Sequence, residues 1–297
     1  MILEKDMQKQ INGGVCAAKG FTANGVLCGI RKNRTKRDLA LIVSEVPASA
    51  AAVYTKNLVK GAPLTVTKNN ISNGIAQAVI CNSGNANTCN ANGIEIAEQM
   101  CQSLSAELKI SAKDVVVAST GVIGQPLNLE PILGGIPALA SGLSKDRGEV
   151  AAEGIMTTDT EVKEIAVEFT VGGATCRLGG IAKGSGMIHI NMGTTLSFVT
   201  TDAAISKAQL QKILGVNAEN SFNRITVDGD MSTNDTVLIL ANGTSGVEIK
   251  ADSAEETLPT GNNSAETFTA LSTHEANNTP TSNNSEIIFI KQCFSQR

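Results

Sequence analysis

The segment at residues 179–202, GGIAKGSGMIHINMGTTLSFVTTD, holds the residues with the clearest chemical potential. Five glycines precede a junction of small residues, and a β-like run then begins with threonine. A hydroxyl beside a peptide bond can attack the preceding carbonyl and form an ester, which water hydrolyses, when the backbone is held in a distorted geometry. Glycine at position 193 lowers the steric cost of that geometry. The pair Gly193-Thr194 is therefore a candidate for self-cleavage.

Cleavage at this pair would make Thr194 an amino-terminal residue. A free α-amino group has a reference pKa of about 7.7 to 8.0 and can accept the hydroxyl proton near neutral pH. One residue would then supply both the nucleophile and the base. On spacing alone, an ordinary loop-to-strand junction competes with this interpretation. A phosphate cradle around Lys183 and Ser185 is a weaker alternative, because neither the P-loop nor the dinucleotide-binding pattern is present.

Other polar residues allow two interpretations each. Asn82, Asn85 and Asn87 could hold a polar ligand, or they could form turns, since asparagine tolerates left-handed backbone. Asp228, Asp230 and Asp235 resemble a calcium loop, but the spacing and the missing later glutamate do not fit one. We interpret these aspartates as structural polar groups near the active site. The basic run at 31–37, RKNRTKR, is best explained as a charged turn.

The elements that must position these residues indicate an α/β (α+β) protein. Short β-like runs alternate with a few helical patterns, and glycine marks nearly every junction. The paired glycines at 172–173 predict a hairpin turn. Ser206 predicts the cap of a helix that reaches Gly215, and apolar spacing predicts another helix at 94–108. The predicted strands cover residues 39–45, 76–81, 114–118, 164–171, 174–178, 195–200 and 236–240.

Composition and charge exclude several classes of partner. The chain has 24 Lys and Arg against 28 Asp and Glu, for a net charge of -4. The basic residues form no long block or helical stripe, which argues against nucleic acid and membrane partners. No run of roughly eighteen apolar residues occurs, and residues 1–10 lack the apolar core of a signal peptide. We therefore expect a cytoplasmic protein.

The cysteines argue against a metal site and against disulfides. The chain has seven, with no CxxC pair, and only His189 and His274 could complete a zinc set. Most of the cysteines lie among apolar neighbours, as small buried thiols of a reducing compartment do. A single reactive cysteine stays open on the sequence alone. No metal or other cofactor is predicted.

Several separated motifs resemble the ornithine acetyltransferases, also called bifunctional glutamate N-acetyltransferases, of arginine biosynthesis. The segment KGSGMIHINMGTTLSFVTTDA at 183–203 resembles the cleavage and nucleophile motif of that family. The resemblance is continuous from about Gly13 to Gly243. It also includes GGVCAAKGF at 13–21, DLALIVSEVPASAAAVYTKNLVKGAP at 38–63, NSGNANTCN at 82–90, STGVIG at 119–124, GIMTTDT at 154–160 and VDGDMSTNDT at 227–236.

The resemblance implies roles for individual residues. Thr194 matches the nucleophile and the residue at which the precursor is cut after Gly193. Thr120 and Gly121 match the pair whose hydroxyl and backbone N–H face the oxyanion. Thr157 and Lys183 match substrate-contacting positions, with Lys183 pairing a substrate α-carboxylate. Taken alone, Lys183 reads as a solvated loop lysine, and Thr157 reads as a helix-terminating hydroxyl.

The resemblance also implies a fold, a reaction and an assembly. The fold is an αββα sandwich of the kind shared with the DmpA-like superfamily. N2-acetylornithine donates its acetyl group to Thr194, and glutamate accepts it. Some members also accept acetyl-CoA as donor, and nothing in this chain distinguishes the two kinds. The cleaved alpha and beta chains usually assemble as a heterotetramer.

Two regions depart from the family pattern. Alanine is usual at the position of Gly193, an apolar residue such as methionine at Thr195, and proline is frequent at Ile190. The loss of a fixed φ at Ile190 is expected to slow cleavage without abolishing it. Residues 251–286 consist mainly of Asn, Thr, Ser, Glu and Ala, and no counterpart of the family's DGEGATK-like run follows ETFTAL at 266–271.

We therefore expect residues 1–193 as the first chain after cleavage and 194–250 as the start of the second. Residues 251–297 are expected to form a disordered or aberrant tail, so that the second lobe is incomplete. Two alternatives follow from these departures. One is a truncated, inactive member of the family, and the other is an amino-terminal-nucleophile amidase of related architecture.

Overall fold

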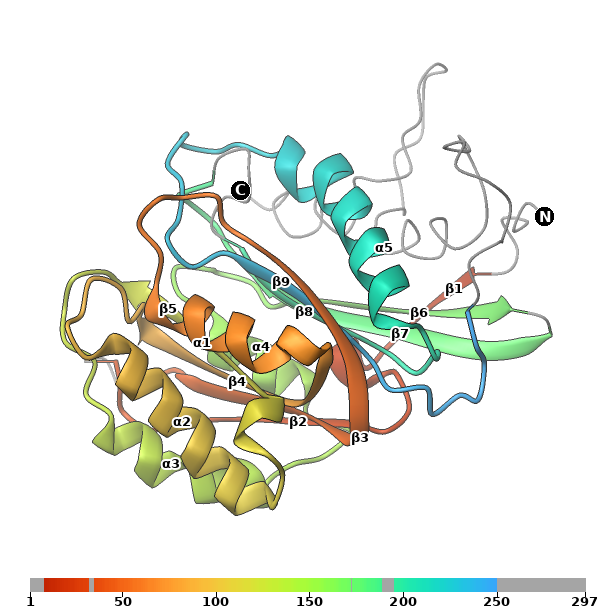
Figure 1. The fold of residues 1–297 in the computed structure, drawn as a ribbon, viewed down its shortest axis with the longest axis horizontal. Coiled ribbons are helices and arrows are strands. Elements are labelled where there is room, and N and C mark those ends of the chain that lie inside the picture. The colour runs from red at the N-terminus through yellow and green to blue at the C-terminus, as the bar shows by residue number, and fades with distance from the viewer. Residues whose placement is uncertain (1–7, 32–34, 172, 189–194, 250–297) are drawn as a thin grey trace.

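A computed structural model describes residues 8–31, 35–171, 173–188 and 195–249, which form nine strands and five α-helices (Figure 1). The strands are β1 (Gln8–Ile11), β2 (Phe21–Val26), β3 (Leu39–Tyr54), β4 (Ile75–Asn85), β5 (Val115–Val122), β6 (Lys163–Val171), β7 (Ala174–Lys183), β8 (Leu196–Thr201) and β9 (Thr236–Ala241). The helices are α1 (Ala62–Asn70), α2 (Gly93–Leu108), α3 (Glu130–Ser141), α4 (Gly148–Ile155) and α5 (Lys207–Asn220). The predicted tail at 251–297 lies outside the described residues.

The long strand β3 joins two halves of one mixed sheet. The strand order is β1-β6-β7-β8-β9-β3-β4-β5, with β2 also paired to β3. Residues 39–44 of β3 pair with β2, and residues 49–54 pair with β9. The pairing of β3 with β4 shifts register between Val43 and Ala48, around Pro47, which has no N–H to donate to a ladder. Strand β3 therefore exchanges its neighbour β2 for β9 at this bulge.

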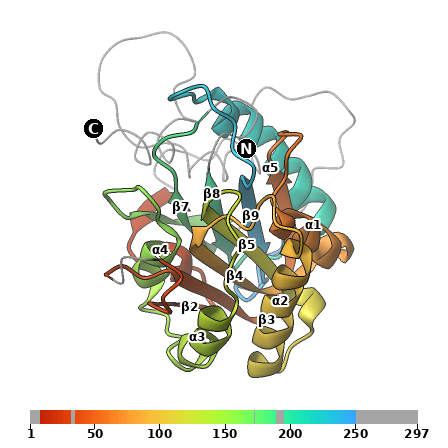
Figure 2. The same ribbon diagram turned by 90° about the vertical axis from the view of Figure 1, so that its left-hand side faces the viewer.

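The two halves of the sheet pack face to face. Side chains alternate along each strand, so that Leu39 and Leu41 of β3 join one apolar cluster while Ala40 and Ile42 join another. The central cluster takes residues from both halves, among them Ile42, Val79, Val116, Ile181, Phe198 and Leu238. A second cluster includes residues of α5, and a third includes residues of α2 and α3. Figure 1 and Figure 2 show where these helices lie on the sheet. This layering confirms the predicted αββα sandwich.

Most predicted elements are present because their local signals agree with the packing. The β-branched runs form strands β3 to β9, and the apolar spacing of residues 94–108 forms α2. Helix α5 begins after Ser206, whose Oγ accepts the N–H of Gln209 at 3.4 Å. The hairpin at 172–173 is confirmed, since Val171 pairs with Ala174 and Gly173 has a φ of +82°.

Helices α1, α3 and α4 and strands β1 and β2 do not follow from the sequence patterns. Helix α3 contains Gly134, Gly135 and Pro137, which all count against a helix, yet Ile132, Ile136 and Leu139 are buried beneath it. The burial of these side chains therefore stabilises the helix despite its low helix propensity. In α4, a Cβ at Gly154 would lie 3.0 Å from the Cβ of Ala40, so the glycine permits close contact with β3.

Candidate active site

The predicted cleavage pair, Gly193 and Thr194, lies outside the described residues, as does Ile190. The chain is described up to Ile188 and again from Thr195. Thr194 is one peptide unit from Thr195, and consecutive α-carbons lie about 3.8 Å apart. The surroundings of Thr195 and Ile188 therefore define where this segment begins and ends.

Thr195 is buried, and its backbone is held on both sides. Its N–H donates to Asp235 Oδ1 at 2.9 Å, and its C=O accepts the N–H of Thr236 at 3.1 Å. Asp235 is also buried, and its Oδ2 has no hydrogen-bond partner among the described residues. Burial raises the pKa of Asp235 to about 8, against the lowering effects of the Ser232 hydroxyl, the Lys183 charge and the Thr195 N–H. The residue after the predicted nucleophile is thus fixed by a buried carboxyl group.

Ile188 is held by the same loop that carries Asp235. Asp228 accepts the N–H groups of Met187 and Ile188 at 2.5 and 2.9 Å, and the C=O of Ile188 accepts the N–H of Val227 at 2.8 Å. The N–H groups of Asp230, Met187 and Ile188 hold the pKa of Asp228 below its ordinary value. The loop at residues 226–236 therefore anchors both described ends of the segment that contains Thr194.

Asn234 connects this loop to the carboxyl ends of β4 and β5. Its Nδ2 donates to the C=O of Ala86 at 2.7 Å and to the C=O of Ser119 at 2.9 Å. Its Oδ1 accepts the hydroxyl of Thr88 at 2.7 Å. Ser119 directly precedes Thr120. The loop that holds Thr195 is thus bonded to the residue next to the predicted oxyanion pair.

Thr120 and Gly121 lie where β5 ends. Thr120 is buried, whereas Gly121 is exposed and has a φ of +130°. A Cβ at Gly121 would lie 2.3 Å from the carbonyl carbon of Gly84 and 2.6 Å from the backbone nitrogen of Asn85. Because backbone atoms cannot yield as a flexible side chain can, position 121 requires glycine. The close approach of β4 and β5 fixes the backbone of the predicted pair.

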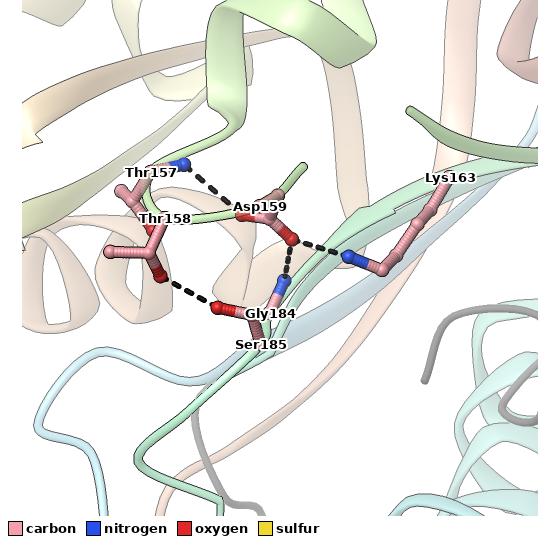
Figure 3. A network of polar contacts seen from close by, with 6 residues as sticks. All are labelled: Thr157, Thr158, Asp159, Lys163, Gly184 and Ser185. Atoms are coloured by element: carbon pink, nitrogen blue, oxygen red, sulfur yellow. Dashed lines mark hydrogen bonds and ion pairs between the residues drawn. The ribbon is translucent and has the colours of Figure 1, made fainter. Parts of the chain in front are cut away.

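Asp159 joins Thr157 to Gly184, the residue after Lys183 (Figure 3). Its carboxylate accepts the N–H of Thr157 at 3.1 Å, the N–H of Gly184 at 2.8 Å and the ammonium group of Lys163 at 2.5 Å. Burial raises the pKa of Asp159, but the bond from Lys163 and the two backbone N–H groups outweigh it and hold the pKa below its ordinary value. This carboxylate therefore joins the segment after α4 to the end of β7.

Lys183 is a buried residue of β7, and it pairs with Leu196 of β8. Burial lowers the pKa of Lys183, while the charges of Asp159 and Asp235 raise it in opposition. The interpretation of Lys183 as a solvated loop lysine is therefore wrong. An additional carboxylate near this buried amine would favour its charged ammonium form, as the charges of Asp159 and Asp235 do.

These contacts and the chain segments between them form a closed ring that passes through the described residues of the predicted site. Ser83 of β4 pairs with Thr120, and its hydroxyl donates to the C=O of Gly154 in α4 at 2.7 Å. From α4 the ring continues to Thr157, through Asp159 to Lys183, and across β7 and β8 to Thr195. Asp235 and Asn234 then return it to Ser119. The ring thus links Thr120, Gly121, Thr157 and Lys183, the predicted site residues that lie within the described ranges.

No sequence pattern identifies Asn234 or Asp159 as site residues, and Asp235 is predicted only as a structural polar group near the active site. Their partners lie far away in the chain: Asn234 bonds to Ser119, and Asp159 bonds to Gly184. An aspartate inside the threonine run at 157–160 was the available signal. It could suggest a bound partner, but it could not identify which backbone groups Asp159 holds.

Asn82, Asn85 and Asn87, at the end of β4 and just after it, donate side-chain hydrogen bonds to backbone carbonyls. The Nδ2 of Asn85 donates to the C=O of Gln125 at 3.0 Å, and the Nδ2 of Asn87 donates to the C=O of Gly93 at 2.8 Å. Asn87 has a φ of +48°. Asn82 donates to the C=O of Asn85, although its Oδ1 is buried without a described partner. Turn formation is therefore the better of the two interpretations.

Two clefts adjoin the ring. A cleft of about 990 Å³ is lined by Met156 and Thr160, on either side of Thr157 in sequence, and by Glu149, Glu153 and Glu164. A second cleft, of about 630 Å³, is lined by Gly84, the register partner of Gly121, and by Arg31 and Val122. Neither cleft includes Lys183 or Thr120 in its lining.

The described cysteines are free thiols. Cys16, Cys81, Cys101 and Cys176 are buried, and Cys89 is exposed. Burial raises the pKa of the Cys81 thiol to about 12, which makes it a poor nucleophile. Within the described ranges, no group of three or more His, Cys, Asp or Glu side chains could hold a metal ion, and no helix is long and apolar enough to cross a membrane.

Comparison with known proteins identifies relatives of this chain. The model of the ArgJ family matches residues 22–275. The arginine biosynthesis bifunctional protein ArgJ of Symbiobacterium thermophilum is 51% identical over 236 residues, which cover 79% of this chain and 59% of that protein. The chain thus spans less than two thirds of the length of the curated relatives that it matches.

Two solved structures are similar to the described fold. The arginine biosynthesis bifunctional protein ArgJ of Bacillus halodurans has a TM-score of 0.59 at 40% identity, over 64% of this chain and 98% of that one. An ornithine acetyltransferase of Mycobacterium tuberculosis, complexed with ornithine, has a TM-score of 0.56 at 34% identity, over 64% of this chain and all of that one. With the family match over most of its length, this chain belongs to the ArgJ family.

Proposed function

We propose that this chain is an autoprocessed acetyltransferase of arginine biosynthesis. It moves the acetyl group of N2-acetylornithine to glutamate through an acetyl-threonine intermediate at Thr194. Its relatives are bifunctional proteins of arginine biosynthesis, and one related structure contains ornithine. The observation that most directly supports this function is the ring of contacts, because it links Thr120, Gly121, Thr157 and Lys183 to Thr195, the residue before β8.

The first step is cleavage of the Gly193–Thr194 peptide bond. The Thr194 hydroxyl attacks the Gly193 carbonyl carbon, and the C–N bond breaks as the nitrogen takes up the hydroxyl proton. Water then hydrolyses the ester to give a Gly193 carboxylate and a free Thr194. The anchored ends at Ile188 and Thr195 support this step, because they restrict the backbone on both sides of the scissile bond.

The second step is acetyl transfer. The Thr194 hydroxyl attacks the acetyl carbonyl of N2-acetylornithine, with its own α-amino group as base, and the ornithine amine leaves with the proton. The glutamate amine then attacks the acetyl carbonyl of the acetyl-threonine ester, the C–O bond to Thr194 breaks, and the threonine oxygen takes up the proton lost by the amine. The Thr120 hydroxyl and the Gly121 N–H stabilise the tetrahedral oxyanion of each attack. Lys183 binds the substrate α-carboxylate, and Thr157 contacts the substrate.

Three further parts of the proposal follow from the family resemblance. Cleavage yields a first chain of residues 1–193 and a second chain that starts at Thr194, with residues 194–250 in the sandwich and 251–297 as a tail. Two copies of each chain assemble as a heterotetramer. Acetyl-CoA is proposed as a second acetyl donor.

Intact mass of the purified full chain tests the proposal. We expect two polypeptides, one ending at Gly193 and one beginning TTLSF, whereas Thr194→Ala should give a single species of 30.7 kDa. The wild type should form N-acetylglutamate from N2-acetylornithine and glutamate. Release of acetate without N-acetylglutamate would indicate the related amidase instead. An uncut wild-type chain with no transfer activity would contradict the proposal.

A further inference from the structure

We propose that Asn234 and Asp235 are positioning residues that set the distance between the two halves of the active site. One half is the Thr120–Gly121 pair at the end of β5, and the other begins at Thr195, directly before β8. This inference rests on the proposed function, because it assigns a task within that site.

The side chain of Asn234 is fixed by hydrogen bonds to residues near the ends of β4 and β5. Both hydrogens of its amide are used, by the C=O of Ala86 at 2.7 Å and the C=O of Ser119 at 2.9 Å. Its oxygen accepts the hydroxyls of Thr88 and Thr233 at 2.7 and 2.6 Å. The side chain is buried, so water does not compete for these groups.

Asp235 is fixed by hydrogen bonds to Thr195, directly before β8, and to Thr55. Its Oδ1 accepts the Thr195 N–H at 2.9 Å, and its own C=O accepts the N–H of Thr55 at 3.0 Å. A single trans peptide unit joins Asn234 to Asp235 and holds their α-carbons about 3.8 Å apart. The distance from Ser119 to Thr195 is therefore spanned by two short side chains and one rigid unit, with no flexible linker.

Two features indicate that this bridge serves more than folding. A Cβ at Gly61 would lie 2.5 Å from Asn234 Nδ2, so the start of α1 leaves room for this amide. The buried Oδ2 of Asp235 has no described partner, which costs stability that an apolar side chain of similar size would not. Retaining a carboxyl group here is explained if the Thr195 N–H must be held in place.

The cleavage rate of the full 297-residue chain tests this role. A displacement of 1 Å between reacting groups can cost about 100-fold in rate. We expect Asp235→Leu, which cannot accept the Thr195 N–H, to slow cleavage about 100-fold. Asp235→Asn keeps an oxygen at the position of Oδ1 and should stay within about 10-fold of the wild type. Asn234→Asp, which turns an oxygen toward two carbonyls, should be slowed about as much as Asp235→Leu.

Asp114→Leu is the matched control, because it makes the same chemical change just before β5, at the end of that strand farthest from Thr120. It should cleave at the wild-type rate. Gly61→Ala is a second probe that displaces the Asn234 amide without altering the carboxyl group, and we expect it to slow cleavage about 10-fold. Melting temperature and hydrogen exchange at the Thr195 amide are measured for every variant, so that loss of folding is separated from loss of position.

The outcomes separate this inference from the proposed function. If the wild type is cut and Asp235→Leu and Asn234→Asp are cut equally fast, the positioning role is wrong while the proposed function stands. If Asp235→Asn is as slow as Asp235→Leu, the accepted hydrogen bond is not what matters, and the role is also overturned. If the wild type releases no chain beginning TTLSF, the proposed function fails and the positioning role fails with it.

Discussion

At the scale of single residues, Asp159 shows how one carboxylate organises two distant substrate-contacting candidates. Its oxygens hold the backbone next to Lys183 and the backbone of Thr157 (Figure 3). Its pKa lies below the ordinary value despite burial, because Lys163 and the backbone N–H groups favour the ionised form. A carboxyl group with a depressed pKa stabilises the folded state only while it is ionised.

We therefore predict a pH-dependent loss of stability in Asp159→Asn. The ionised Asp159 contributes stability that is present above the pKa of the unfolded chain, about 3.9, and is lost as pH falls through the lower folded value. At pH 7 the variant should be less stable by about 2 kcal/mol, and the difference should shrink below about pH 4. Unfolding in denaturant across pH 3 to 7 measures it, with exposed Glu161→Gln as control. A difference that stayed constant with pH would contradict this account.

Thr120 supplies a second prediction at this scale. Thr120→Val keeps the shape of the buried side chain but removes the hydroxyl, and it should lower the rate of acetyl transfer about 100- to 1000-fold. Thr120→Ser keeps the hydroxyl and should retain most of the rate. Single-turnover formation of N-acetylglutamate measures both variants. Equal rates for the valine and serine variants would show that the hydroxyl has no part in stabilising the oxyanion.

At the scale of elements, two helical glycines should respond oppositely to alanine. A Cβ at Gly215 of α5 meets nothing within 4 Å, whereas one at Gly154 of α4 would lie 3.0 Å from the Cβ of Ala40 and 3.1 Å from the C=O of Leu39. Gly215→Ala should stabilise the protein by about 0.5 to 1 kcal/mol, since alanine favours the helix. Gly154→Ala should destabilise it, because α4 must move away from β3. Thermal unfolding decides the sign of each change.

The elements also show how far sequence reasoning reaches. Runs of Val and Ile gave β4, β5, β8 and β9, because local alternation and burial agree there. The first part of β3 was predicted at 39–45, but the strand continues through Pro47 to Tyr54. Its extension depends on pairing with β9, which lies almost two hundred residues away in the chain. Long-range partners of this kind leave no local pattern.

The same limit applies to the candidate site. Thr120, Gly121, Thr157 and Lys183 were identified because their motifs resemble a known family, and the structure places them in one ring. The sequence could not show that Lys183 is buried, because a lysine in a glycine-rich loop is usually solvated. Its burial depends on the packing of β7 between β6 and β8.

At the scale of the whole molecule, the central apolar cluster should make both sheet halves unfold together. Phe198 is almost fully buried in that cluster with residues of β4 and β5. Phe198→Ala should cost about 3 to 5 kcal/mol. Native-state hydrogen exchange should accelerate in β4 and β5 as well as in β8 and β9. Acceleration confined to β8 and β9 would mean that the halves behave as separate cooperative units.

Strand β8 begins at Leu196, two residues after the proposed cut, and is paired on both sides, with β7 before the cut and β9 after it. Strand β9 pairs in turn with β3. The two polypeptides would therefore both contribute strands to one sheet. They could separate only if the hydrogen bonds between β7 and β8 and those between β3 and β9 were broken. The nicked protein should elute as one species in native buffer and come apart only in denaturant. Thr194 would be exposed as a new terminus without either polypeptide being released.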